Sequence, residues 1–159
     1  MDLAELEGQG SIQKLPVDGN KVRDAFRLAE RDLRTAKEVM KTDHNWAFSI
    51  AYNAILQASR ALMFSEGYRS HGTAQHVSVV KFVEAFLGDE FSDSIIAFDR
   101  MRRKRHIAVY GAPGLISTTE SENAIRRAEQ LLSRIEGMLV GKGHLETRKK
   151  TGTKTIKGE

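Results

Sequence analysis

The sequence predicts an all-α fold, a five-helix antiparallel up-and-down bundle. Apolar residues recur at spacings of three and four along five segments, which is the period of one face of a helix. Only 2 of the 159 residues are proline, and Ala, Leu, Glu, Lys and Arg, which favour helix, are abundant. No segment has the alternation typical of a strand, and the connections are short, as in an antiparallel bundle.

The chain divides into a leader, a helical domain and a tail. Residues 1–18 have no periodicity and contain glycine and proline, so we expect a flexible leader. Residues 19–141 carry the helical pattern and fit one domain. Residues 142–159 hold six basic and two acidic residues, which is the whole net charge of +4. Such a tail buries too little apolar surface to become ordered, so we expect disorder, either as a solubilising end or as a basic segment that contacts nucleic acid.

The first two predicted helices are separated by a polar break. The first begins near Asn20, and Asp43 can cap the second, which runs over about residues 45–66. The apolar face of the first consists of Val22, Phe26, Ala29, Leu33, Ala36 and Met40. Core packing is the default expectation for Trp46 and Tyr52 on the second helix, although Tyr52 can instead line a cleft, because its hydroxyl needs solvent or a partner.

The remaining three helices are marked by caps and stops. Thr73 can cap the third helix, and Ser92 can cap the fourth, which continues to Tyr110. Thr119 and Glu122 can form a capping box for the fifth helix. The apolar face of this last helix consists of Ala124, Ile125, Ala128, Leu131, Leu132, Ile135 and Leu139.

Composition limits both the cellular setting and the chemistry. The chain has no cysteine, which excludes disulfides and thiolate metal sites and fits a cytoplasmic protein. The first ten residues lack the apolar run of a signal peptide, and no stretch is long enough to span a bilayer. His71 and His76 lack the spacing of metal ligands, so they are interpreted as surface or capping residues. We expect neither a metal nor a cofactor.

The basic centre of the fourth helix, residues 99–106, is the unusual feature of the sequence. On a helical projection, Arg105 and Arg102 fall within the core-facing stripe, and His106 and Tyr110 follow on its shoulder. A guanidinium cannot lose its charge at neutral pH, so one buried in an apolar stripe needs a partner. It can pair with a carboxylate, extend to solvent, or line a cleft or subunit interface that receives an anion.

Two short motifs carry a resemblance to a known family. Residues 49–62 read SIAYNAILQASRAL and precede Gly67 and His71, and residues 105–111 read RHIAVYG. These motifs resemble the HEPN (higher eukaryotes and prokaryotes nucleotide-binding) domain family. Its members show an aromatic–alanine element, an Ala-Arg-Ala-Leu-like run, and later an arginine followed by a polar residue and then a histidine or tyrosine. The resemblance covers roughly residues 20–140.

The resemblance implies a HEPN-like homodimer from a cytoplasmic toxin–antitoxin or defence system. In ribonuclease-active members of the family, arginine and histidine from both subunits meet in a cleft and cleave RNA without metal. Many members are toxins paired with a small nucleotidyltransferase antitoxin. The resemblance thus implies Arg105, His106 and Tyr110 as catalytic residues. Arg105 and Arg102 would bind RNA or nucleotide phosphates, His106 would transfer a proton, and Tyr110 would orient the substrate.

The sequence departs from the family pattern at the catalytic histidine. Alignment on Arg105 places Tyr110 at that position, and tyrosine is a poor base at neutral pH. The expectation is therefore a weak or inactive metal-independent ribonuclease, with His106 as the remaining candidate base. The alternative is a non-catalytic interaction module that binds a small nucleotidyltransferase partner.

Overall fold

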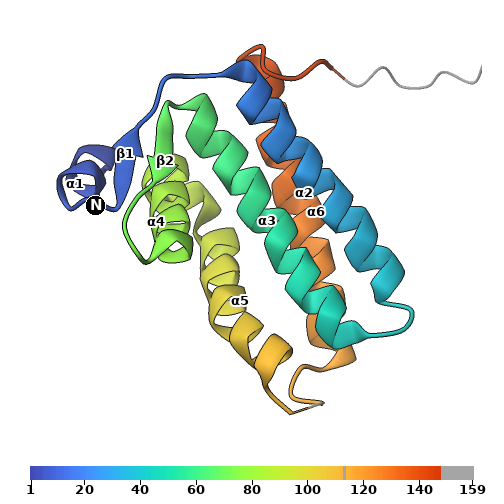
Figure 1. The fold of residues 1–159 in the computed structure, drawn as a ribbon. Coiled ribbons are helices and arrows are strands. Elements are labelled where there is room, and N and C mark those ends of the chain that lie inside the picture. Colours follow the sequence, from blue (N-terminus) through green and yellow to red (C-terminus); the bar gives the residue numbers. More distant parts are fainter. Residues whose placement is uncertain (113, 148–159) are drawn as a thin grey trace, which may run out of the picture.

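The computed structural model describes residues 1–112 and 114–147, and its architecture is helical as predicted (Figure 1). Four long helices run alternately down and up. They are α2 (Gly19–Val39), α3 (His44–Ser65), α5 (Ser92–Tyr110) and α6 (Thr118–Gly141). A shorter helix, α4 (Gln75–Leu87), and the 3-10 turn η1 (Asp89–Phe91) connect α3 to α5. These five α-helices correspond to the five that the sequence predicts.

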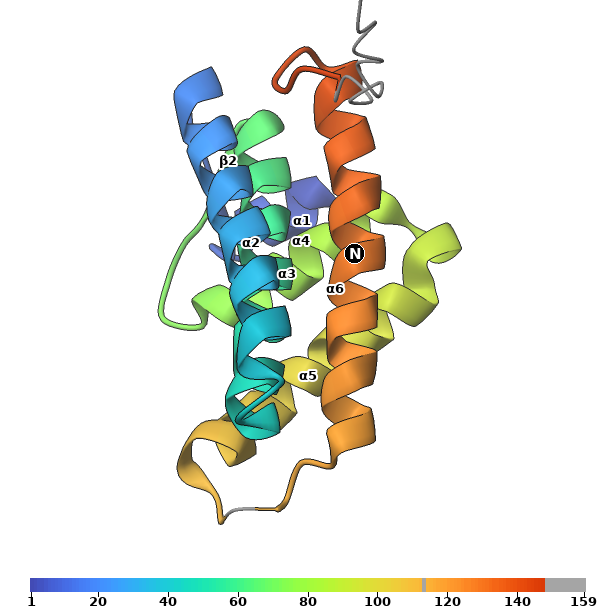
Figure 2. The same cartoon turned by 90° about the vertical axis from the view of Figure 1, so that its right-hand side faces the viewer.

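The central helix is α3, which packs against α2, α4, α5 and α6. Figure 2 shows α2 and α6 on either side of it. Of its 22 residues, 14 are buried, so α3 is enclosed nearly all round. Ala51, Ala54, Ala58 and Ala61 are fully buried, and their small side chains let the neighbouring helices approach α3 closely. This central position places Tyr52 inside the bundle, facing α4 and α5.

The first turn of α3 differs from the sequence-based expectation. Asp43 caps the helix as predicted, with its side chain accepting from the backbone nitrogen of Trp46 at 3.1 Å. Trp46 itself is 53% exposed, so the prediction that it packs in the core is wrong. It lies in the first turn of the helix, before α3 becomes enclosed by its neighbours.

Three predicted helix caps are displaced. The residue before α5 is Phe91, with no side-chain cap, so Ser92 does not cap that helix. The residue before α4 is Ala74, with no side-chain cap, so Thr73 does not cap that helix. The capping box of α6 is formed by Ser117 and Glu120 instead of the predicted pair, which lies two residues further on. The register of a cap is weakly specified by sequence because several Ser, Thr and Glu residues cluster at this helix start.

The expected flexible leader is instead part of the fold. Residues 3–8 form the helix α1 (Leu3–Gly8), and β1 (Ile12–Lys14) pairs antiparallel with β2 (Tyr68–Ser70). Leu6 and Ile12 are almost completely buried. The predictions of a flexible leader and of a chain without strands are therefore wrong. Strands of three residues and isolated apolar side chains give no periodicity that a sequence pattern can detect.

Only the start of the predicted basic tail falls within the described residues. Lys142 pairs with Glu66, and the backbone nitrogens of His144 and Leu145 bond to the carbonyl of Leu139. Residues 148–159, on which most of the prediction of disorder falls, lie outside the described residues. In the part of the chain that the structure describes, no helix combines the length and apolar character needed to cross a bilayer.

Candidate anion-binding site

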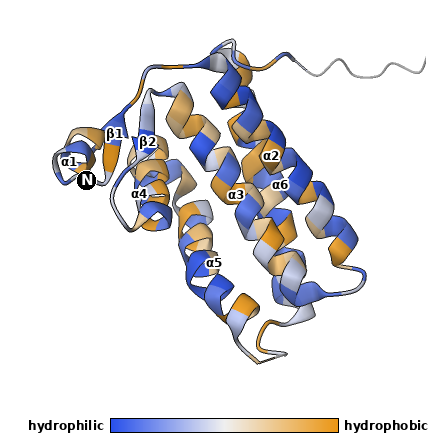
Figure 3. Ribbon diagram, viewed as in Figure 1, coloured by the Kyte–Doolittle hydropathy of each residue, from blue (hydrophilic) through white to orange (hydrophobic). Residues whose placement is uncertain are grey.

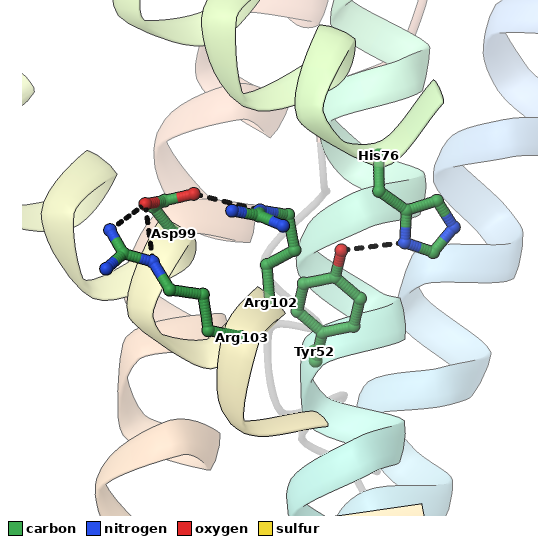
Figure 4. Close-up of polar contacts among 5 residues, drawn as sticks. All are labelled: Tyr52, His76, Asp99, Arg102 and Arg103. Carbon is green, nitrogen blue, oxygen red and sulfur yellow. Dashed lines mark hydrogen bonds and ion pairs between the residues drawn. The ribbon is translucent and has the colours of Figure 1, made fainter. Parts of the chain in front are cut away.

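Tyr52 connects three helices at the centre of the site. Its side chain is fully buried on α3, and its hydroxyl lies 2.9 Å from Nδ1 of His76 on α4 (Figure 4). Its ring packs against Phe98 of α5, with 5.7 Å between the ring centroids. The hydroxyl therefore has the partner that a buried tyrosine requires.

Arg105 extends from α5 to the same tyrosine. Its guanidinium carbon lies 5.8 Å from the centroid of the Tyr52 ring. Its Nε is buried and has no hydrogen-bond partner, and no carboxylate pairs with Arg105 among the described residues. A buried donor left without an acceptor costs about 1–3 kcal/mol. Of the three arrangements open to this arginine, pairing with an internal carboxylate is thus absent from the described part of the chain.

Arg102, one turn earlier on α5, is satisfied differently. Its Nε donates to Oδ1 of Asp99 at 2.9 Å, and Arg103 binds the other oxygen of the same carboxylate (Figure 4). Burial alone raises the pKa of Asp99, but the hydrogen bonds from Arg103 and Arg102 outweigh it and hold this pKa below its usual value. Asp99 therefore remains charged and partly neutralises Arg102, whereas Arg105 has no such counter-charge.

Three guanidiniums, those of Arg105, Arg102 and Arg60, act on the pKa values of Tyr52 and His76. Burial raises the pKa of Tyr52 to about 12, although Arg105, Arg102 and Arg60 act in the opposite direction. Burial also lowers the pKa of His76, and the same three arginines lower it further. At neutral pH both side chains are uncharged, so they do not compensate the cations. We call these five residues the arginine cluster.

The comparison with known protein families covers this region. A model of the HEPN domain matches residues 22–138. The chain belongs to the HEPN domain family. No curated protein matches the chain. The matched span begins in α2, ends in α6 and includes every residue of the arginine cluster, and membership supports a nucleotide-binding or ribonuclease-like module.

The predicted site residues of this HEPN domain lie in two groups. Arg102 and Arg105 belong to the arginine cluster. His106 and Tyr110 are exposed on α5, with their rings 5.0 Å apart, and Tyr110 is 75% exposed. Within one chain, the structure therefore brings the two arginines together around Tyr52 and leaves the histidine and tyrosine of α5 on the outside of the HEPN domain.

Sequence reasoning missed two members of the cluster, His76 and Arg60. Arg60 lies within the first HEPN motif, two turns after Tyr52, but an arginine on an apolar helix gave no signal of its own. His76 was interpreted as a surface or capping residue because its partner lies on another helix, 24 residues away. Contacts of this kind between helices depend on how the helices pack, which no spacing in the sequence records.

The cluster is suited to binding an oxyanion. Guanidinium groups present a planar set of donors that matches phosphate, and they keep their charge at any physiological pH. His76 adds a neutral imidazole that can accept or donate a proton at the edge of the cluster. The arrangement can therefore bind phosphate and can hold a proton next to it.

Proposed function

We propose that this HEPN domain binds RNA or nucleotide phosphates through Arg105, as a cytoplasmic component of a toxin–antitoxin or defence system. The buried Nε of Arg105, which has no acceptor among the described residues, carries the proposal. A phosphate oxygen would supply that acceptor and a counter-charge in one contact. The absence of cysteine favours the cytoplasmic location.

The neighbours of Arg105 support an anionic ligand. Arg102 and Arg60 act on the same Tyr52–His76 pair, so positive charge accumulates there, and of the three arginines only Arg102 has a carboxylate partner among the described residues. Placing like charges together in a partly buried site is unfavourable in the absence of a ligand. An incoming phosphate would relieve this repulsion, which favours a binding role over a purely structural one.

Homodimer formation through α5 is part of the proposal. Ile96, Ile107 and Tyr110 fall on one exposed side of this helix, and they are 59%, 40% and 75% exposed. Arg100 and Arg103 separate Ile96 from the other two residues on this side, so the apolar surface that a second chain would cover centres on Ile107 and Tyr110 near the end of the helix. In such a dimer, His106 and Tyr110 would face the partner subunit, where His106 would transfer the proton and Tyr110 would orient the substrate in metal-independent cleavage.

The decisive experiment compares two arginine variants of the full chain. Arg105→Ala removes the proposed phosphate contact, and Arg34→Ala removes an exposed arginine of α2, which packs on α3 and α6. Fluorescence anisotropy with labelled structured RNA, and calorimetry with ATP, would be recorded in EDTA. We expect about a tenfold or greater loss of affinity for Arg105→Ala alone. Equal affinity of the two variants would refute the proposal.

A second candidate function is a non-catalytic module that binds a small nucleotidyltransferase partner. It is favoured by Tyr110, which occupies the position of the family's catalytic histidine and is largely exposed. Incubation of the wild-type and Arg105→Ala proteins with RNA separates the two functions. Cleavage by the wild-type protein alone would identify a ribonuclease, whereas no cleavage by either, together with stable binding of a nucleotidyltransferase, would identify the module.

A further inference from the structure

A second basic region lies between α5 and α6, on a different face of α5 from the arginine cluster. A groove with a volume of about 660 Å³ runs between α5 and α6, within the size range of ligand-binding clefts. Its cationic lining residues are Arg100 and Lys104 from α5 and Arg126 and Arg127 from α6. Figure 3 shows hydrophilic turns in the lower half of α5.

The positive charge of the groove is only partly compensated. Its single acidic lining residue, Glu120, pairs with Lys104, and this hydrogen bond holds the pKa of Glu120 below its usual value. Arg126 donates to the uncharged side chain of Asn123 at 3.1 Å. Arg100 and Arg127 have no carboxylate partner among the described residues. Three guanidiniums therefore face the groove without counter-charge.

The surroundings of these cations strengthen their effect on a ligand. Residues 1–141 are neutral overall, so the charge in the groove is a local concentration and not a property of the whole surface. The apolar side chains of Phe48 and Met101, which are 3% and 6% exposed, form the floor of the groove. A cleft with charges of one sign and apolar walls focuses the electric field and attracts anions.

The position of the groove indicates which anion it suits. Lys104 lines the groove and Arg105 belongs to the arginine cluster, so consecutive residues of α5 serve the two regions. A polymer with regularly spaced phosphates can contact both at once, which a single nucleotide cannot. We propose that the groove between α5 and α6 binds backbone phosphates of single-stranded RNA while Arg105 holds another phosphate of the same strand. This inference rests on the proposed function and extends it to an RNA path.

The test uses RNA length to separate the groove from the cluster. The double variant Arg126→Ala/Arg127→Ala removes two groove arginines, and Arg27→Ala/Arg34→Ala removes two exposed arginines of α2 as the matched control. Affinities of the full-length proteins for a uridine dinucleotide and for an oligouridylate of about twelve nucleotides would be measured over a range of salt concentrations. The basic residues 148–159 are present in every variant, so their contribution cancels.

Distinct results support or overturn the inference. We expect the groove variant to lose about tenfold in affinity for the long RNA, with a salt dependence shallower by about 1, and to bind the dinucleotide like the control. Equal binding of the long RNA by groove variant and control would overturn it. Binding of polyglutamate would be measured in parallel. If the groove variant lost affinity for polyglutamate alone, the inference would also be overturned, and the groove would be assigned to an acidic protein.

The two proposals fail in different ways. If the wild-type protein does not bind the dinucleotide, or if Arg105→Ala binds it equally well, the proposed role of Arg105 is wrong. Loss of long-RNA affinity in the groove variant would then still establish the groove as an RNA-binding surface, although without a continuous path to Arg105. Normal dinucleotide binding with no effect of the groove variant would refute the groove alone.

Discussion

The guanidinium of Arg105 lies over the ring of Tyr52, with 5.8 Å between its carbon and the ring centroid, and has no carboxylate partner among the described residues. The aromatic face offers this cation a favourable surface without neutralising it. Tyr52 in turn directs its hydroxyl to His76, so one buried side chain positions a cation on one side and an imidazole on the other. The charge of Arg105 thus remains available to a ligand.

The first prediction concerns the stability that the protein loses at alkaline pH when Tyr52 titrates. Burial raises its pKa from 10.0 to about 12, so between these values the folded protein retains a proton that the unfolded chain has lost. This contribution to stability is fully present below pH 10 and is lost as the pH rises to 12, at about 1.4 kcal/mol for each pH unit.

Tyr52→Phe removes this titration together with the hydrogen bond to His76. At pH 8 we expect the variant to be about 0.5–1.5 kcal/mol less stable than the wild-type protein. At pH 11 the difference should shrink or reverse, because only the wild-type protein has lost the tyrosine contribution. Urea denaturation at both pH values measures the difference, and the same difference at pH 8 and 11 would contradict the prediction.

How far the sequence predicts the site depends on which contacts stay within one helix. The periodicity of α5 placed Arg102 and Arg105 among core-facing residues, and both side chains are partly buried. The same projection could not show that Asp99 satisfies Arg102 and leaves Arg105 unpaired. It also could not place His76 beside Tyr52, because that contact depends on how α4 crosses α3.

A second prediction concerns the titration of His76. Burial lowers its pKa, and Arg60, Arg105 and Arg102 lower it further. Removing one of these cations should raise the pKa of His76, so Arg105→Ala should move its NMR titration toward higher pH, whereas Arg34→Ala should leave it unchanged. Identical titration curves in the wild-type and Arg105→Ala proteins would show that Arg105 does not act on the imidazole.

The lowered pKa of His76 also affects the stability of the protein at acidic pH. The folded-state pKa of His76 lies below 6.5, so below this pH the unfolded chain binds the proton first. Stability contributed by the neutral imidazole is present above pH 6.5 and is lost as the pH falls through the folded-state pKa. His76→Gln should therefore show a smaller loss of stability than the wild-type protein between pH 7 and pH 5 in urea denaturation.

A third prediction concerns Asp99, the carboxylate that binds both Arg102 and Arg103. Asp99→Asn releases the two guanidiniums and removes a negative charge next to the arginine cluster. We expect RNA affinity to rise severalfold, with a steeper salt dependence. The cost in stability should stay below about 1 kcal/mol, because these ion pairs within one helix are partly exposed to solvent.

The matched control for this variant is Asp32→Asn on α2. It also removes a carboxylate that pairs with an arginine of its own helix, Arg31, but at a distance from α5. Anisotropy measurements with the same labelled RNA should show no gain for the control. A fall in affinity for Asp99→Asn would indicate that Asp99 orients Arg102 toward the ligand, contrary to the prediction.

The N-terminal segment marks the limit of prediction for the fold. Five helices follow from apolar periodicity because each presents a long stripe to the core. Leu3 and Leu6 are three residues apart, but α1 has only six residues and Ile12 lies in a strand of three, so the periodic signal is too short to detect. The burial of Leu6 and Ile12 follows from the place that α4 and β2 offer them, and it is visible only once the helices are assembled.

The final prediction tests whether this segment contributes to stability. Leu6 is fully buried on α1, which packs against α4, so Leu6→Ala leaves a cavity and should cost about 2–4 kcal/mol. Val17 lies between β1 and α2 and is 54% exposed, so Val17→Ala should cost less than about 0.5 kcal/mol. Urea denaturation measures the stability of both variants.

The same variant should also affect the contact between His76 and Tyr52. Because α4 carries His76, loosening α1 should weaken this contact, and the pKa of His76 in Leu6→Ala should move toward its ordinary value. If both variants match the wild-type protein in stability and titration, α1 contributes neither to stability nor to the contact between His76 and Tyr52.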